Sequence, residues 1–268
     1  MIQLPAKNLS RETNALLSKY QADVDAKPGF AGRVELAARK FKQANRRRSV
    51  AFTEVKTVLN AMCMGARRCM YCEDSAADEV EHHHPKDFYP EYVFVWWNYL
   101  YACGPCNGTK NSRFALFKDE AVVELIRRRG EPSTPPFKGK AVLLHPRTEN
   151  PLDYLMLDIA GGTFLFVPKT SAPSREFSRA EYTIRILRLN DRDYLPAARR
   201  EAYESYKARV GAYGLLRNRG VGDASLDTLV RAVGRMQHPT VWHEMRRQRT
   251  LIPELGALFA DVPEALTW

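Results

Sequence analysis

Apolar residues follow a helical period over the first 66 positions of the chain. They recur three and four places apart at 35–42 and again at 52–64, which is the spacing of one buried helix face. Short apolar runs replace this pattern in the middle of the chain. The run 154–168 is interrupted by Gly161-Gly162, and this arrangement predicts a β-hairpin.

The helical pattern returns after position 177. Ser178 and Glu181 stand three residues apart, as in a capping box, which predicts that a helix begins at Ser178. The dipeptide 190–191 then predicts a break before a second helix that reaches about Tyr213. Shorter helices are expected in the tail, 225–260. The whole pattern favours an α+β fold that is mainly helical.

Composition agrees with a folded globular protein. The chain has 268 residues, of which 45% are hydrophobic and 27% are charged. It contains no apolar run of about 18 residues, so no membrane span is expected. The start, MIQLPAKNLSRET, lacks the apolar core of a signal peptide. We therefore expect a cytoplasmic protein.

The net charge points toward an anionic partner. Lys and Arg number 41 against 31 for Asp and Glu, which gives +10. Such a surplus attracts polyanions, although it can also serve solubility alone. Several arginines in the C-terminal half either line a nucleic-acid groove or simply face solvent: Arg179, Arg185, Arg188, Arg192, Arg199 and Arg200.

Four of the five cysteines form two CxxC pairs. Cys69 and Cys72 make the first pair, and Cys103 and Cys106 make the second after 30 intervening residues. Two such turns can complete a tetrahedron of thiolates around zinc, and four protein ligands leave no open position for catalysis. A redox CxxC is the alternative. Cys63 is left over and is expected to be a small buried hydrophobic residue.

Polar residues between and just after these pairs carry candidate chemistry. Glu81 and Asn107 supply the oxygen ligands that Mg²⁺ or Mn²⁺ prefers. A neutral imidazole beside them, as in His82, can take a proton from water. A metal there would stabilise negative charge on a phosphate. These groups are the parts of a one-metal phosphodiesterase.

The run of three histidines needs a separate assignment. In an extended strand His82 and His84 face one side, whereas His83 faces the other. His84 and Lys86 are candidates for contacts with a metal or a phosphate. The aromatic residues that follow are expected in the core rather than on a base-stacking surface: Tyr92, Trp96 and Trp97.

The stretch 69–114 resembles the ββα-metal finger of the HNH endonucleases, in the variety with two zinc knuckles. The order CxxC, acid-His, Asn, CxxC-Asn-x-x-Lys is present in full. The resemblance implies that His82 is the general base and that Asn98 holds its loop or ring in register. It implies that Glu81 and Asn107 bind the catalytic Mg²⁺ or Mn²⁺, with Lys110 near the phosphate.

A further resemblance covers more of the chain. The segments YCE and VEHHHPK, and the helix pair at 177–203, are similar to the HNH subunit of Septu-type anti-phage systems. Members of that group act with an ABC-type ATPase, sometimes alongside a retron. The chain has no GxxxxGK[ST] loop, so any ATP dependence is expected to come from such a partner.

The leading hypothesis is therefore a metal-dependent endonuclease that acts on DNA or on structured RNA such as tRNA. We expect a helical segment at 1–66, a zinc-stapled finger at 67–118, and a mainly helical region with a hairpin at 119–268, which provides packing and partner or nucleic-acid contacts. Two alternatives stay open: a stand-alone restriction-type endonuclease, and a zinc-stapled nucleic-acid-binding module without catalysis.

Overall fold

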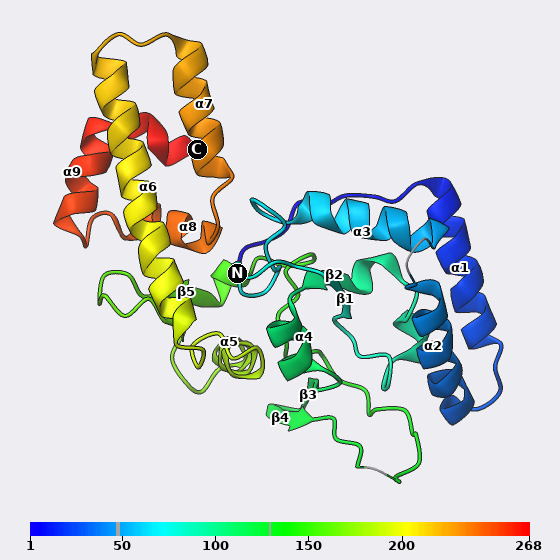
Figure 1. The fold of residues 1–268 in the computed structure, drawn as a ribbon. Helices are drawn as coiled ribbons and strands as arrows, with labels where there is room; N and C mark the ends of the chain where they lie inside the picture. Colours follow the sequence, from blue (N-terminus) through cyan, green and yellow to red (C-terminus); the bar gives the residue numbers. More distant parts are fainter. Residues whose placement is uncertain (47–48, 129) are drawn as a thin grey trace.

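Two lobes build the molecule, as the computed structural model of residues 1–46, 49–128 and 130–268 shows (Figure 1). The first lobe holds the N-terminal helices α1 (Arg11–Asp25), α2 (Phe30–Ala44) and α3 (Val50–Met62) beside the cysteine-bearing segment. The second holds α6 (Tyr194–Asn218), α7 (Asp223–Gly234), α8 (Pro239–Gln248) and α9 (Pro253–Asp261). The helices predicted at both ends of the chain are confirmed.

Helix α3 fixes the position of the segment that follows it. Its N-cap is Ser49, whose hydroxyl accepts a hydrogen bond from the Phe52 amide at 3.4 Å. Phe52, Val55 and Leu59 lie on one face and are fully buried. This face packs against β2 of the cysteine segment. Cys63 ends the helix and is half-buried.

The cysteine segment has the order strand, strand, helix. Strand β1 (Glu79–His82) pairs antiparallel with β2 (Tyr99–Ala102), and His82 lies opposite Tyr99. Helix α4 (Gly104–Lys110) follows directly. The connection between the strands contains two short 3₁₀ helices, η1 (Pro90–Tyr92) and η2 (Trp96–Asn98). Two short strands and one helix therefore make up this segment.

Two further hairpins flank this segment. The predicted hairpin at 154–168 is confirmed: it follows the 3₁₀ helix η3 (Pro151–Asp153) and consists of β5 (Leu155–Leu157) paired with β6 (Phe166–Pro168). A second hairpin, β3 (Ala115–Lys118) with β4 (Ala121–Glu124), was not predicted and spans the boundary placed at residue 118. The described part of the chain is therefore a mainly helical α+β fold.

The start of the C-terminal helices differs from the prediction. Helix α5 (Arg175–Ile186) begins before Ser178, because Ser174 is its N-cap. The Ser174 hydroxyl accepts a hydrogen bond from the Phe177 amide at 3.0 Å. Helix α6 begins at Tyr194 after Asp193 and continues to Asn218, beyond Tyr213. The chain ends in the 3₁₀ helix η4 (Pro263–Thr267).

The arginines of this region do not form one exposed face. Arg199 is buried and donates to the carbonyls of Phe164 and Leu189 at 2.9 and 2.7 Å, which ties α6 to the β5–β6 hairpin and the end of α5. Arg179 pairs with Glu149 at 2.7 Å. Within the ranges that the structure describes, no helix is both long and apolar enough to span a bilayer.

Candidate functional site

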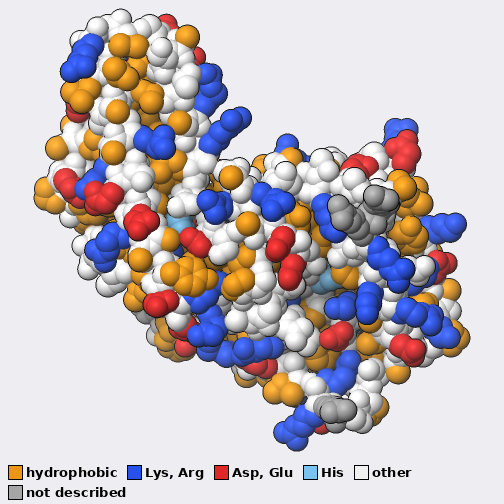
Figure 2. Space-filling model, viewed as in Figure 1, with side chains coloured by type: hydrophobic (Ala, Val, Ile, Leu, Met, Phe, Trp, Pro, Cys, Tyr) orange, Lys and Arg blue, Asp and Glu red, His pale blue; other side chains and the backbone are white. Residues whose placement is uncertain are grey.

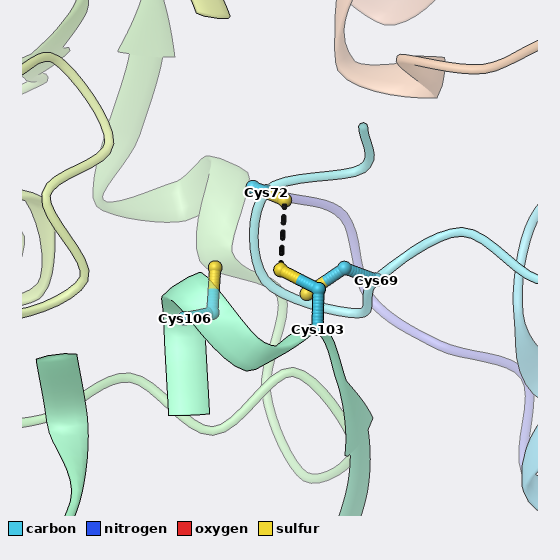
Figure 3. Close-up of side chains that lie close together, drawn as sticks. All are labelled: Cys69, Cys72, Cys103 and Cys106. Carbon is cyan, nitrogen blue, oxygen red and sulfur yellow. Dashed lines mark hydrogen bonds between the residues drawn. The ribbon is translucent and has the colours of Figure 1, made fainter. Parts of the chain in front are cut away.

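The four predicted cysteines come together in one buried cluster (Figure 3). Cys69 and Cys72 lie in the turn before β1, whereas Cys103 caps α4 and Cys106 belongs to its first turn. Their sulfur atoms lie within 4.8 Å of one another, and those of Cys72 and Cys103 are 3.8 Å apart. A tetrahedron with Zn–S bonds of about 2.3 Å has sulfur–sulfur edges of about 3.8 Å. The cluster therefore fits a structural zinc ion.

Two N–H groups point at these sulfurs. The Tyr71 amide donates to Cys69 Sγ at 3.4 Å. A guanidinium nitrogen of Arg192, from the turn between α5 and α6, donates to Cys106 Sγ at 3.3 Å. Such hydrogen bonds orient metal ligands and offset the excess negative charge of four thiolates. Arg192 was predicted only as a groove or surface residue, since its 86-residue separation from Cys106 gives no local signal.

Glu81 and Lys110 form a buried ion pair behind the cluster. Lys110 Nζ lies 2.5 Å from Glu81 Oε1 and donates to the His82 carbonyl at 2.8 Å. The lysine side chain is fully buried and the carboxylate is 6% exposed. Burial raises the pKa of Glu81, and the positive charge of Lys110 opposes this rise. Lys110 thus holds Glu81, and its contact with a phosphate stays a prediction.

His82 ends β1 with its ring enclosed by aromatic residues. The ring centroids of Phe41 and Tyr99 lie 4.3 and 5.3 Å away. Nε2 is 2.9 Å from the Val93 carbonyl oxygen, and a carbonyl only accepts, so Nε2 carries the proton. The neutral ring therefore keeps a free lone pair on Nδ1. Burial lowers the pKa of His82 to about 3, which favours this neutral form.

Asn98 ties together the loop that leaves His82. Its Oδ1 accepts the His84 amide at 2.7 Å, and its Nδ2 donates to the carbonyls of His84 and Tyr92 at 3.1 and 3.0 Å. The Asn98 carbonyl also accepts the His83 amide at 2.9 Å. Asn98 is fully buried, so it acts on the loop backbone.

A solvent-open cavity of about 410 Å³ brings several candidates together. Glu81, His82, Lys86 and Asn107 are among its lining residues, whereas Asn98 and Lys110 lie behind it and His84 does not line it. Glu79 also lines the cavity and accepts a hydrogen bond from Asn107 Nδ2. This contact leaves Oδ1 of Asn107 as the free acceptor. Glu79 was not predicted, although its place two residues before Glu81 on a strand was a signal.

The predicted shared face for His82 and His84 is wrong, because β1 ends at His82 and strand alternation stops there. The His84 ring instead packs 5.0 Å from Tyr89, and its Nδ1 lies 3.3 Å from His83 Nδ1. The His83 ring lies 4.1 Å from His145, a contact between the finger and the 141–146 segment. Burial lowers the pKa of His84 to about 4 and that of His145 to about 3.

The charge lining the cavity is mainly acidic: Asp78, Glu79, Glu81 and Asp87 line it, against the basic Lys86. Figure 2 shows that both basic and acidic side chains, in blue and red, are exposed on this face of the first lobe. The acidic side chains of the cavity suit a divalent cation.

Comparison with known proteins gives one partial match. The chain is 44% identical over 54 residues to the Septu protein PtuB of Bacillus thuringiensis. The match covers 18% of this chain and 21% of the relative, so the chain spans about a fifth of that relative's length. No family model matches the chain. No solved structure matches it either.

Proposed function

We propose that this protein is a metal-dependent HNH endonuclease that hydrolyses phosphodiester bonds of DNA or tRNA-like RNA. The observation that carries the proposal is the meeting of Glu81, His82 and Asn107 in one cavity. Helix α4 lines this cavity through Asn107 and also carries Cys106. The cysteine cluster and the candidate reactive group Asn107 are therefore held by the same helix.

His82 is the general base in this proposal. Its proton is fixed on Nε2 by the Val93 carbonyl, so Nδ1 can accept a proton from the attacking water. Phe41 and Tyr99 hold the ring in place, and Asn98 holds the loop that follows. The base is therefore positioned before substrate arrives.

Glu81 and Asn107 would hold the catalytic Mg²⁺ or Mn²⁺. A carboxylate and a carboxamide oxygen suit a hard divalent cation, and the Glu79 contact presents Oδ1 rather than Nδ2 of Asn107 to the cavity. When bound, the cation supplies charge stabilisation at the phosphate. Lys110 keeps the Glu81 carboxylate in place from behind.

The biological setting follows from the partial relative. Similarity to a Septu protein supports a role as the nuclease effector of an anti-phage defence complex. An ABC-type ATPase is the partner that we propose for gating, with a retron as a further component. The net charge of +10 supports nucleic acid as the substrate.

The deciding experiment is cleavage of supercoiled plasmid and of total tRNA with Mg²⁺ or Mn²⁺. We expect the wild type to cut one of them and His82→Ala to lose about 10²–10⁴-fold in rate, because only the proton acceptor is removed. His243→Ala, which removes an exposed histidine on α8, is the matched control and should cut normally.

Equal cleavage by wild type and His82→Ala would refute the assigned base. If neither protein cuts, the assay is repeated with the candidate ATPase and ATP. Binding of nucleic acid without cleavage under both conditions would favour the non-catalytic zinc module.

A further inference from the structure

A second cavity lies across the 83–92 loop from the candidate active site. It has a volume of about 520 Å³ and opens to solvent. Its walls come from the first turn of α2, from the loop around η1, and from the 135–139 segment: Phe30, Arg33, Tyr89, Tyr92, Phe137 and Lys138. The volume lies within the usual range for a small-molecule or nucleotide pocket.

Aromatic faces dominate this cavity. The Tyr89 and Tyr92 rings lie nearly parallel, with centroids 5.9 Å apart and an interplanar angle of 11°. Tyr89 is braced edge-on by Phe114 at 5.6 Å. Tyr92, Phe30 and Phe137 are all half-buried rather than enclosed in the core. Tyr92, which was expected in the core, is half-buried and lines this cavity.

The 135–139 segment is fixed in place against the loop. One guanidinium, that of Arg127, donates to the Asp87 carbonyl at 2.7 Å and to the Thr134 carbonyl at 3.1 Å. Gly139 passes so close to β3 that a Cβ there would collide with the Phe117 carbonyl. The cavity is thus built by the fold before any ligand binds.

Its charge favours an anionic ligand. Arg33 and Lys138 contribute two positive charges against one negative charge from Glu91. The Arg33 guanidinium carbon lies 5.9 Å from the Phe30 ring centre. Its Nε is buried and has no hydrogen-bond partner among the residues that the structure describes. The positive charge of the Arg33 guanidinium would attract the phosphate of a bound ligand.

We propose that this cavity binds one unpaired nucleobase and its phosphate, next to the phosphodiester that is cut. Aromatic rings with adjacent cations are the usual platform for single-stranded nucleic acid. Pro85, Lys86 and Asp87 line the active-site cavity, and Tyr89, Glu91 and Tyr92 line this one, so one strand can contact both. The proposal rests on the nuclease function and adds that the substrate is unpaired at the site.

Binding of single strands tests the proposal. The full-length His82→Ala protein is titrated with a 12-nucleotide DNA or RNA strand that carries one 2-aminopurine, and with the same strand in a duplex. We expect tighter binding of the single strand and quenching at one or two positions of the 2-aminopurine. Phe137→Ala and Arg33→Ala should each weaken binding about 5- to 150-fold and abolish the quenching.

Matched controls separate the cavity from general effects. Tyr194→Ala removes an exposed tyrosine of α6, and Arg39→Ala removes an exposed arginine of α2 that does not line the cavity. Both should bind as the parent does. Tyr92→Phe should retain binding while Tyr92→Ala loses it, and thermal melting verifies that each variant is folded.

Unchanged affinity in Phe137→Ala and Arg33→Ala would overturn the proposal, as would a preference for duplex that these variants do not alter. The cleavage assay is a separate readout. Cavity-dependent strand binding by a wild type that never cuts would sink the nuclease function and leave this site intact. If the protein cuts nucleic acid and the cavity variants bind and cut as the wild type does, the nuclease function stands and the base-binding site is refuted.

Discussion

At the scale of single residues, the site depends on charges that the fold has buried in pairs. Lys110 is fully buried against Glu81, and its other contacts are backbone carbonyls. Breaking such a pair from one side leaves an uncompensated charge in a medium of low polarity, which costs far more than an exposed pair contributes.

Lys110→Met should therefore destabilise the protein by about 3–5 kcal/mol, because Glu81 loses its counter-ion while the side-chain volume is kept. Urea unfolding followed by circular dichroism measures this. Lys110→Met combined with Glu81→Gln should recover part of the loss. A single variant that unfolds at the wild-type midpoint would mean that the pair contributes no stability.

Arg192 contacts the four-cysteine cluster from outside it. Arg192→Ala removes its hydrogen bond to Cys106 Sγ and should weaken zinc binding about 10- to 100-fold, the usual effect of an outer-shell partner. Zinc transfer to a chromogenic chelator measures the release. Arg200→Ala is the control, since Arg200 donates to the Gly162 carbonyl and, among the described residues, to no cysteine. Equal release from both variants would contradict the role of Arg192.

At the scale of elements, one asparagine organises the loop between β1 and β2. The loop of residues 83–98 forms one wall of both cavities, so its backbone must be held in place. Asn98 makes three side-chain hydrogen bonds to it, two of them to His84.

Asn98→Ala should cost at least about 2 kcal/mol of stability, because buried N–H and C=O groups lose their partners. It should also increase hydrogen exchange at the His84 amide. Asn98→Asp keeps an acceptor for the His84 amide but loses the two hydrogen bonds that Nδ2 donates. The His84 amide should therefore exchange more slowly in Asn98→Asp than in Asn98→Ala. Wild-type exchange in Asn98→Ala would refute this function of Asn98.

The elements that could be predicted are those with local signals. The CxxC pairs and the 154–168 hairpin both depend on residues near one another in the chain. The start of α5 was misplaced because Ser174 and Ser178 both stand where a cap is possible, and the choice depends on packing. Arg192 and the aromatic cavity depend on contacts between distant segments, which no local pattern contains.

At the scale of the whole molecule, the four-cysteine cluster lies where the two lobes meet. Glu73, next to Cys72, accepts two hydrogen bonds from Thr240 at the start of α8. The Thr240 hydroxyl donates at 2.8 Å and its amide at 3.1 Å. Asp74 contacts His238 Nε2 at 3.2 Å. Arg192 reaches Cys106 from the other side. Both knuckles therefore contact the C-terminal region directly.

Removing the metal should consequently loosen more than the finger. Zinc binding contributes to folding free energy, so we expect a chelator under reducing conditions to lower the melting temperature by more than about 10 °C. Hydrogen exchange should rise both in the segment 69–110 and in the first turn of α8, because Glu73 and Asp74 move with the knuckle. The first turn of α7, where Asp223 and Ser225 are exposed, is the internal control, since its amides are expected to exchange fast with and without zinc. Increased exchange confined to 69–110, with α8 unchanged, would show that the cluster serves the finger alone.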